Sequence, residues 1–337
     1  MKSQFFILAI LTTLGLNACK SDKAEETSAP PKTVAVPRFD RDSAFAFVEK
    51  QVSFGPRVPN SEAHKACREW LVSKFKAYGA TVIEQSFDAK AYNGEVLKST
   101  NIIAQYNPGN SNRIVLAAHW DSRPMADSPI NQERRNEAVL GADDGASGVG
   151  VLLEFARQLQ ANPLDLGVDI VLFDAEDYGE SKEEYANEEE QRLSVYSWGL
   201  GSQYWSRNLH AGNYRPRYGI LLDMVGAKGA RFPKESYSMR FAPEVVEKVW
   251  KLAQNMGYSN YFVEADGGGV TDDHFFVNTI AGIKMIDIIN RPDQTETGFG
   301  AHWHTHNDDM RIIDPLTLRA VGQVMLAVVY REASDSI

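Results

Sequence analysis

Apolar stretches rich in β-branched residues alternate along this chain with stretches whose apolar residues recur every three or four positions. The first pattern predicts strands and the second predicts helices. The predicted strands span residues 81–87, 100–106, 113–118, 168–173, 218–225 and 283–289. The predicted helices span residues 43–52, 61–78, 148–160, 201–209, 243–256 and 316–330. The alternation predicts an α/β domain with helices on both faces of a largely parallel sheet.

Composition narrows the class of protein. The chain has 337 residues, of which 43% are hydrophobic and 24% are charged, and this balance is typical of a globular protein with a buried core. We find no internal linker or repeat after residue 38, so we expect residues 39–337 to form a single domain. The formal net charge is -10, without a basic stripe, which argues against nucleic acid as a partner.

The N-terminus has the features of a bacterial lipoprotein signal peptide. Lys2 is followed by a short, mostly apolar run at 5–16 and by Leu-Asn-Ala-Cys, which ends at Cys19 and resembles the lipobox, where the cysteine is acylated. The run is shorter than the about 20 residues that span a bilayer. We therefore predict a signal peptide at 1–18 and a lipid on Cys19. The alternative is a cleaved signal with an ordinary cysteine.

Residues 19–38 are polar, small and proline-containing, which predicts a flexible tether between the membrane and the domain. If Cys19 carries lipid, Cys67 has no intrachain disulfide partner. Lys20 follows the cysteine in place of the Asp associated with inner-membrane retention. We therefore expect an exported, lipid-anchored protein on the outer membrane, facing the periplasm or the cell surface.

Polar residues follow the predicted strands directly. His119 and Asp121 come after the strand at 113–118, Glu176 and Asp177 after 168–173, and Asp223 falls within 218–225. The strand at 283–289 is flanked by Asp272-Asp-His on one side and Trp303-His304 on the other. Sites in open α/β sheets form at the carboxyl ends of strands. Segments that deliver His, Asp and Glu to that edge predict one metal site.

The segment Gly-Ala-Asp-Asp-Gly-Ala-Ser-Gly at 141–148 adds a loop of small residues. Such a loop can bend tightly and bring a carboxylate, from Asp143 or Asp144, close to a metal. Zinc binds Asp and Glu oxygens and His nitrogens in tetrahedral geometry, and a catalytic site keeps one position for water or substrate. Asp144, Asp177 and His304 form such a three-ligand set.

Each of these motifs also has an ordinary structural explanation. A His-x-Asp at a strand end can be a hydrogen-bonded surface pair, Glu176-Asp177 can lie in a solvated loop, and glycine-rich turns before helices are common. Their joint occurrence in one chain, in order and each beside a strand, favours a site because independent motif matches multiply.

Five motifs together resemble the zinc aminopeptidase superfamily and its glutaminyl cyclase branch. They are His119-x-Asp121, Gly141-Ala-x-Asp144, Phe173-Asp-x-Glu176-Asp177, Leu222-Asp223-Met-Val-Gly226 and Trp303-His304-Thr305. The likeness runs from Phe39 to the C-terminus and is greatest to the animal-type glutaminyl cyclases of Bacteroidetes. It implies a phosphorylase/hydrolase-like three-layer α/β/α sandwich with a central mixed, largely parallel sheet.

The resemblance leaves two enzyme branches open. Dinuclear zinc aminopeptidases use five metal ligands, and all five positions are filled here, by His119, Asp144, Asp177, Asp223 and His304. His119 and Asp121 are thus candidates for a second metal or for positions behind the ligands. A non-catalytic, lipid-anchored binding module would be expected to lack ligands, and none is missing.

Two features favour the cyclase branch. Asp272 stands where the aminopeptidases usually carry Ser before Asp-His, and in the cyclases it faces the residue that matches Asp223, where close carboxyls share a proton. Trp303 precedes the metal histidine as in the cyclases, where it walls a small pocket; Trp198 lies in a matching region. A departure is Asp177, which stands where animal cyclases have Glu, and either carboxylate suits zinc.

The resemblance therefore implies a glutaminyl-peptide cyclotransferase with one zinc per chain. Glu176 is the implied general acid/base, and Asp272 with Asp223 holds the substrate amide. The implied partners are peptides or exported proteins with an N-terminal glutamine, and we expect a monomer. The glutamate-rich stretch from Glu180 to Arg192 has no counterpart in the animal enzymes, and we predict that it is a solvated surface loop.

Overall fold

The computed structural model describes Met1 and residues 35–182, 184–293, 295–334 and 336. The predicted signal peptide, Cys19 and most of the predicted tether lie outside the described residues. Within the described ranges, no helix combines the length and the apolar character needed to cross a membrane.

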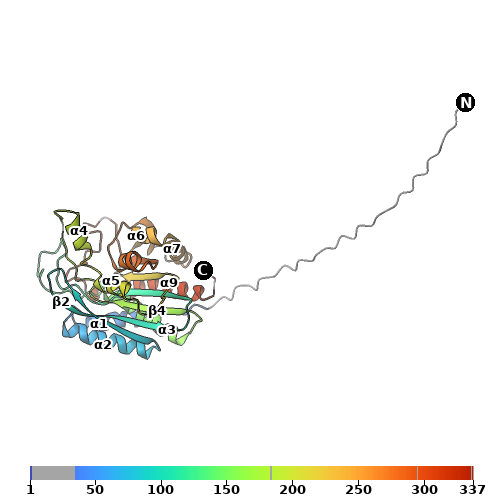
Figure 1. Ribbon diagram of the computed structural model, residues 1–337, viewed down its shortest axis with the longest axis horizontal. Helices are drawn as coiled ribbons and strands as arrows, with labels where there is room; N and C mark the ends of the chain where they lie inside the picture. The colour runs from blue at the N-terminus through green and yellow to red at the C-terminus, as the bar shows by residue number, and fades with distance from the viewer. Residues whose placement is uncertain (2–34, 183, 294, 335, 337) are drawn as a thin grey trace.

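A six-stranded sheet forms the centre of the fold (Figure 1), and it contains all six predicted strands. The strands follow the order β1-β2-β4-β3-β5-β8. The last four in that order run parallel, and β1 and β2 are antiparallel additions at one edge. The bounds are β1 (Thr81–Lys90), β2 (Val96–Tyr106), β3 (Arg113–His119), β4 (Gly167–Phe173), β5 (Gly219–Asp223) and β8 (Met285–Ile289).

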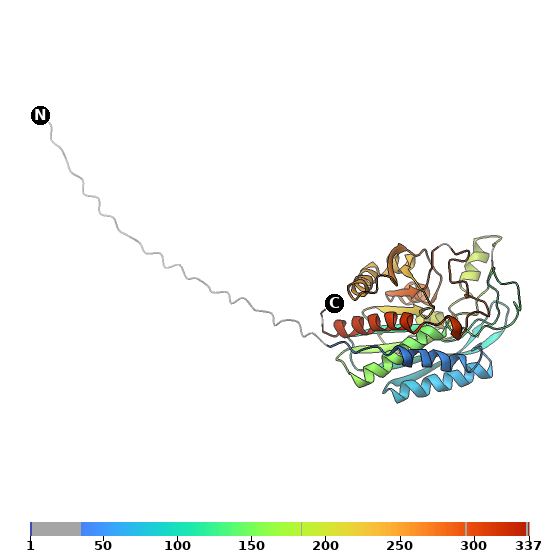
Figure 2. The same cartoon turned by 180° about the vertical axis from the view of Figure 1, so that it is seen from behind.

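Helices cover both faces of this sheet. Figure 2 shows one face, on which α1 (Arg41–Val52), α2 (Glu62–Ala77), α3 (Ala146–Ala161) and α9 (Pro315–Glu332) lie side by side. The opposite face carries α5 (Leu200–Arg207) and α8 (Asp273–Phe276), and α7 (Pro243–Asn255) packs against α9. The structure confirms the predicted three-layer α/β/α fold with a mixed, largely parallel sheet.

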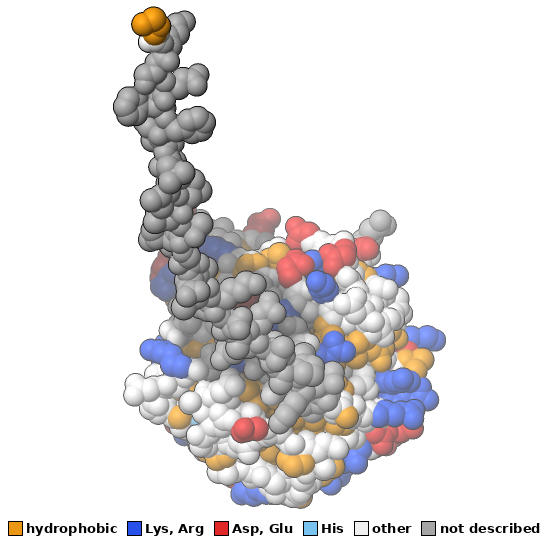
Figure 3. Space-filling view, turned by 90° about the vertical axis from the view of Figure 1, so that its right-hand side faces the viewer, with side chains coloured by type: hydrophobic (Ala, Val, Ile, Leu, Met, Phe, Trp, Pro, Cys, Tyr) orange, Lys and Arg blue, Asp and Glu red, His pale blue; other side chains and the backbone are white. Residues whose placement is uncertain are grey.

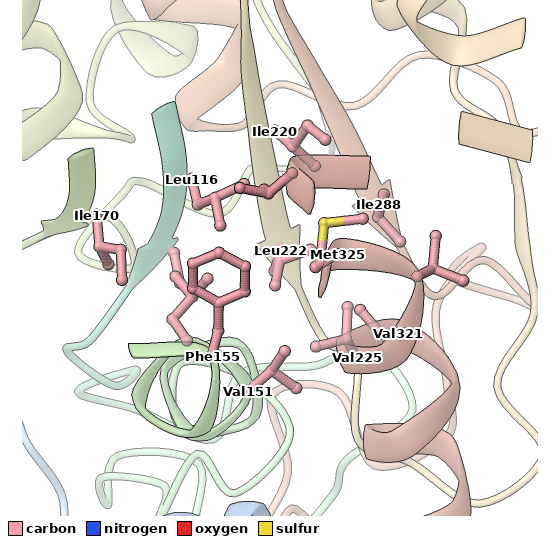
Figure 4. Packing of buried hydrophobic residues seen from close by; sticks show 14 of the residues in the cluster. Leu116, Val151, Phe155, Ile170, Ile220, Leu222, Val225, Ile288, Val321 and Met325 are labelled. Carbon is pink, nitrogen blue, oxygen red and sulfur yellow. The ribbon is translucent and has the colours of Figure 1, made fainter. Parts of the chain in front are cut away.

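The main core lies between the sheet and the α3–α9 layer. Figure 4 shows Leu116 and Ile220 from the strands facing Phe155 of α3 and Met325 of α9. These side chains are fully buried, and burying one such apolar side chain contributes about 1.5–3 kcal/mol. This packing fixes the positions of the strand ends at the edge of the sheet.

Helix ends agree with the capping signals in the sequence. Ser61 caps α2, where its hydroxyl accepts a hydrogen bond from the backbone N–H of His64 at 3.1 Å. Asp314 caps α9, and Pro315 occupies the first helical position, as expected for a residue that lacks a backbone donor. At the start of α1, Phe39 is buried and the carbonyl of Pro37 accepts from Gln323 Nε2 at 2.9 Å.

Several short elements were not predicted from the sequence. A two-stranded parallel sheet is formed by β6 (Phe232–Lys234) and β7 (Phe262–Asp266). Short helical segments are α4 (Glu188–Val195), α6 (Ser236–Phe241), α8, η1 (Val277–Ala281) and η2 (Met310–Ile312). These elements are too short to show a clear hydrophobic period in the sequence.

The prediction of a surface loop from Glu180 to Arg192 is wrong for the second half of that stretch, which forms the start of α4. The side chain of Asn187 caps this helix by accepting from the backbone N–H of Glu190 at 2.9 Å. Three glutamates fill the first turn, where the helix dipole favours negative charge. The segment is nevertheless solvent-exposed as expected. More generally, Figure 3 shows charged side chains of both signs spread over the face in view.

Candidate metal centre and substrate pocket

The ends of three neighbouring parallel strands deliver polar side chains to one edge of the sheet. His119 is the last residue of β3, Asp223 is the last residue of β5, and Glu176 and Asp177 follow β4 after a turn of two residues. The strands are paired in parallel, so their carboxyl ends meet. All four side chains are buried at that edge.

Asp144, Asp177 and His304 come together as one cluster. A potential ligand atom of each lies within 4.8 Å of the others, and His304 Nε2 lies 3.1 Å from Asp177 Oδ1 and 3.8 Å from Asp144 Oδ2. Asp177 Oδ2 is buried without a hydrogen-bond partner among the described residues. Two carboxylates and one imidazole with an unsatisfied buried oxygen form a donor set that fits zinc.

The electrostatics of this cluster also favour a positive charge among its carboxylates. Burial and the nearby charge of Asp144 raise the pKa of Asp177 to about 6. Burial alone would lower the pKa of His304, but the charge of Asp177 raises it to about 9. The acids therefore favour a cation among them, and a bound metal would replace the proton, because a ligating imidazole is neutral.

The structure distinguishes between the two aspartates of the glycine-rich loop. Asp144 faces the cluster, whereas Asp143 Oδ1 accepts from the backbone N–H of Gly226 at 2.7 Å and Asp143 Oδ2 lies 2.9 Å from His302 Nε2. The carboxylate of Asp308 in turn accepts from the backbone N–H groups of Asp143 and Asp144, at 2.7 and 3.1 Å. Asp143 is thus a structural residue, and Asp144 is the candidate ligand.

Three residues beside the site have a left-handed backbone although they are not glycine. They are Ala175, Met224 and His304, with φ values of 53°, 48° and 52°. Such conformations cost on the order of 1 kcal/mol or more each and concentrate at functional sites. At Met224 the turn ends a strand early: β5 stops at Asp223 instead of running to Val225 as predicted.

A second candidate cluster shares Asp144 with the first. It consists of His119, Asp144 and Asp223, all buried. His119 Nε2 lies 3.0 Å from Asp144 Oδ1 and 3.1 Å from Asp223 Oδ1. The five positions expected for a dinuclear site are therefore together in space, and in this arrangement the imidazole of His119 links the two carboxylates by hydrogen bonding.

Asp121 belongs to neither cluster and instead shapes the loop after β4. Its two carboxylate oxygens accept from the backbone N–H groups of Glu176 and Asp177, each at 3.1 Å. Asp121 was a candidate either for a second metal or for a position behind the ligands. The geometry favours the position behind the ligands.

Glu176 lies beside the candidate metal ligands without joining either cluster. Its carboxylate lines the same cavity as Asp144, Asp177 and His304, and Oε2 lies 4.0 Å from His119 Nδ1. Burial raises the pKa of Glu176 well above the ordinary value for a glutamate. A carboxyl group with a raised pKa at the edge of a metal site is suited to accept and return a proton.

Asp223 and Asp272 line the same cavity from two different elements, β5 and the N-cap of α8. Burial and the charge of Asp272 raise the pKa of Asp223 well above its usual range. Burial also raises the pKa of Asp272, and the charge of Asp272 helps to raise the pKa of buried Asp287 on β8. Neighbouring buried carboxyls of this kind hold at least one proton between them.

The predicted tryptophans form walls of the cavity, whose volume is about 380 Å³. The Trp303 ring stacks on His304 with centroids 3.7 Å apart and on Phe299 at 4.6 Å. The Trp198 ring is stacked at 6.1 Å from His304 and is covered from behind by the Arg123 guanidinium at 4.6 Å. A cavity of this size with aromatic walls is typical of a site that binds a small group.

The fold and these clusters define a class of zinc-dependent hydrolases and transferases, and residues 101–329 match peptidase family M28. The chain belongs to this family. It is 49% identical to a glutaminyl cyclase of Bacteroides thetaiotaomicron that was solved with N-acetylhistamine bound, with a TM-score of 0.84 over 88% of this chain and 99% of that chain.

Other relatives differ in name. A structure described as a Zn-dependent exopeptidase from Parabacteroides distasonis is also 49% identical, with a TM-score of 0.83 and the same coverage of 88% and 99%. The glutaminyl-peptide cyclotransferase of Drosophila melanogaster is 27% identical over 287 residues, which span 78% of this chain and 73% of the fly protein. These findings confirm the resemblance to bacterial glutaminyl cyclases, and the family also holds peptidases.

Four residues important for this geometry were not found from the sequence. Asp127 lies 3.2 Å from His304 Nδ1, Arg123 binds Asp127 and the carbonyl of Asp177, and Asp308 holds the glycine-rich loop. Asp287 sits buried beside Asp272. Of these four residues, only Asp287 could have been found from the sequence. An acidic residue inside the apolar run Met-Ile-Asp-Ile-Ile needs a buried partner.

Proposed function

We propose that this protein is a glutaminyl-peptide cyclotransferase, which converts an N-terminal glutamine of a peptide or protein to pyroglutamate. The observation that carries the proposal is the single aromatic-walled cavity, which is lined by Glu176, by Asp223 with Asp272 and by the three candidate zinc ligands. The similarity to bacterial glutaminyl cyclases supports it.

The reaction is an intramolecular acyl transfer. The α-amine of the N-terminal glutamine attacks the carbon of its own side-chain amide, a new C–N bond closes a five-membered lactam, and the C–N bond to the amide nitrogen breaks. The α-amine gives up a proton, the leaving nitrogen gains one, and ammonia departs. Because the reacting groups belong to one residue, orientation in a small pocket supplies much of the rate.

Different residues of this chain have different roles in that reaction. Asp144, Asp177 and His304 would hold one zinc ion, which as a Lewis acid polarises the amide carbonyl when bound. Glu176 takes the proton from the α-amine and returns it to the leaving nitrogen. Asp272, paired with Asp223, accepts a hydrogen bond from the amide nitrogen, and the indole of Trp303 packs against the glutamine side chain.

A second candidate is a dinuclear zinc aminopeptidase, which removes an N-terminal residue. The observation in its favour is the second cluster, His119, Asp144 and Asp223, which contains the remaining ligands of a dinuclear site. Two features argue for the cyclase instead: Asp272 lines the cavity together with Asp223, and the indole of Trp303 stacks on His304 as a wall of the cavity.

The proposal includes the setting of the enzyme. We infer that Cys19 carries a lipid, that the protein is anchored to the bacterial outer membrane and faces the periplasm or exterior, and that it works as a monomer on exported peptides and proteins. Phe39 and Pro37 pack against α9, so the chain that would lead to such an anchor departs beside that helix.

One experiment separates the two candidates. Purified protein is analysed for zinc per chain, and it is incubated with a short amidated peptide that begins with glutamine. One zinc with release of ammonia and no free amino acid supports the cyclase. Two zinc ions with release of free glutamine would overturn it in favour of the aminopeptidase.

A further inference from the structure

Arg291 is the one Arg or Lys among the described residues that line the candidate active-site cavity. The same lining contains five acidic residues, namely Asp144, Glu176, Asp177, Asp223 and Asp272. Arg291 follows β8 by two positions, and its backbone N–H donates to the carbonyl of Arg231 at 2.9 Å. This hydrogen bond fixes the backbone of Arg291 close to the end of β8.

The guanidinium of Arg291 is held in place but has no acidic partner. It stacks over the Phe299 ring at 4.5 Å from the centroid. Gly298 packs closely against the guanidinium, because a Cβ at residue 298 would lie 2.7 Å from Nη2. Among the described residues no carboxylate lies within 4.0 Å of it and no oxygen accepts a hydrogen bond from it. Arg291 is half-buried and lines the cavity.

A row of stacked groups leads from the candidate metal ligand to this guanidinium. His304 stacks on Trp303 at 3.7 Å, Trp303 on Phe299 at 4.6 Å, and Phe299 on Arg291 at 4.5 Å. If the glutamine lies against Trp303, the next residue of the peptide continues along this row, because an extended chain advances about 3.5 Å per residue.

The charge of the cavity gives Arg291 a discriminating role. Without Arg291 the described lining of the cavity would contain acidic side chains and no Lys or Arg, and the whole chain has a net charge of -10. Arg291 offers donors in a fixed fork that matches a carboxylate. Buried Asp287 and Glu235 act on Arg291 only from a distance, and burial holds its pKa below the usual value for arginine.

We propose that Arg291 is a specificity-determining residue, which binds a carboxylate on the second residue of the substrate. This inference rests on the proposed cyclase function. The carboxylate can belong to an Asp or Glu side chain, or it can be the free C-terminus of a dipeptide. In either case the enzyme favours glutamine followed by a carboxylate-bearing residue, against the repulsion expected from its overall charge.

Two pairs of peptides test the proposal with the zinc-loaded enzyme. The first pair is Gln-Glu-Ala-amide and Gln-Gln-Ala-amide, and the second is Gln-Ala with a free or an amidated C-terminus. We expect kcat/KM for ammonia release to favour the carboxylate in at least one pair by about tenfold, the value of one charge-assisted hydrogen bond in a partly solvated site. The pair that responds identifies the source of the carboxylate.

Variants link that preference to the residue. Arg291→Gln should abolish the preference mainly through KM, since the contact is made equally in the ground and transition states. Arg291→Lys should retain part of it. Arg231→Gln is the matched control, because it removes the same charge from an exposed neighbour that does not line the cavity, and it should keep the preference.

Salt gives an independent measurement on the unaltered enzyme. The preference should shrink as NaCl rises from about 0.05 to about 0.5 M, because exposed charge pairs are screened. Equal kcat/KM within both pairs, or a preference that survives in Arg291→Gln, would overturn the inference while ammonia release upholds the cyclase. Failure to release ammonia from any of the four peptides would instead overturn the proposed function, and the inference with it.

Discussion

Asp127 Oδ1 lies 3.2 Å from Nδ1 of His304, whose Nε2 lies 3.1 Å from Asp177. The carboxylate of Asp127 is itself held by Arg123, whose Nε donates at 3.0 Å. A carboxylate behind a ligating histidine fixes its tautomer and orientation and makes the imidazole a better ligand. Asp127 therefore bears on whether the cluster binds zinc.

We predict that Asp127→Asn weakens zinc binding by about 10- to 100-fold, the usual effect of losing such a partner. The measurement is competition for zinc with a chelator of known affinity, which needs no enzyme assay. Asp88→Asn, an exposed aspartate on β1, is the matched control. Zinc affinity unchanged in Asp127→Asn would show that Asp127 does not support a metal ligand.

Glu176→Gln separates proton transfer from binding. The amide is nearly isosteric with the carboxylate but cannot accept the proton of the α-amine. We expect kcat to fall by about 10²- to 10⁴-fold, with zinc content and KM close to those of the unaltered enzyme. Single-turnover ammonia release and elemental analysis check this. Near-normal turnover would exclude Glu176 as the general base.

Gly179 allows Trp198 to form its wall of the pocket. A Cβ at residue 179 would collide with the indole of Trp198, so Gly179→Ala must displace the ring. We expect an increase in KM and a loss of about 1–3 kcal/mol of stability, as is typical of overpacking. Gly212→Ala is the control, because nothing lies within 4 Å of a Cβ there. Equal KM for both variants would contradict a role of Trp198 in the pocket.

Glu235 should make stability depend on pH. Burial alone would raise its pKa, but the hydrogen bond and charge of His274 lower it to about 2 from 4.5. A group with a depressed folded-state pKa contributes stability above its unfolded pKa, and that contribution is lost as pH falls through the folded value. Buried Asp287 and half-buried Arg291 also act on this environment.

The predicted loss for Glu235 therefore falls between about pH 4.5 and about pH 2. The measurement is the urea midpoint at pH 6 and at pH 3.5 for the unaltered protein and for Glu235→Gln. The variant should be less stable at pH 6, and the difference between the two proteins should narrow at pH 3.5. A constant difference would mean that Glu235 does not titrate with folding.

Cys67 reports on unfolding. It is a free thiol buried in α2, and burial raises its pKa to about 12. The thiolate is the reactive form, so a thiol reagent at pH 8 should label Cys67 only after denaturation. The comparison is the initial labelling rate with and without urea. Rapid labelling of the native protein would show that α2 opens readily.

The periodic patterns of the chain predicted the main sheet and the long helices because each of these elements buries a regular apolar face. Short elements were missed for the converse reason. In β6, for example, Phe232 and Lys234 pair with Phe262 and Asp266 of β7, and no local pattern marks that partnership. The charge of the glutamate-rich stretch predicts a loop, whereas the side chain of Asn187 caps α4 there.

The candidate site also shows this difference between what the sequence determines and what the tertiary structure determines. Sequence order and residue type determined that His119, Glu176, Asp177 and Asp223 would be delivered to one sheet edge, because the carboxyl ends of parallel strands meet there. Only the tertiary structure decided that Asp144 rather than Asp143 faces the cluster and that Asp127, Asp287 and Arg291 surround it. Those placements depend on contacts between segments distant in the chain, and such contacts leave no periodic trace in the sequence.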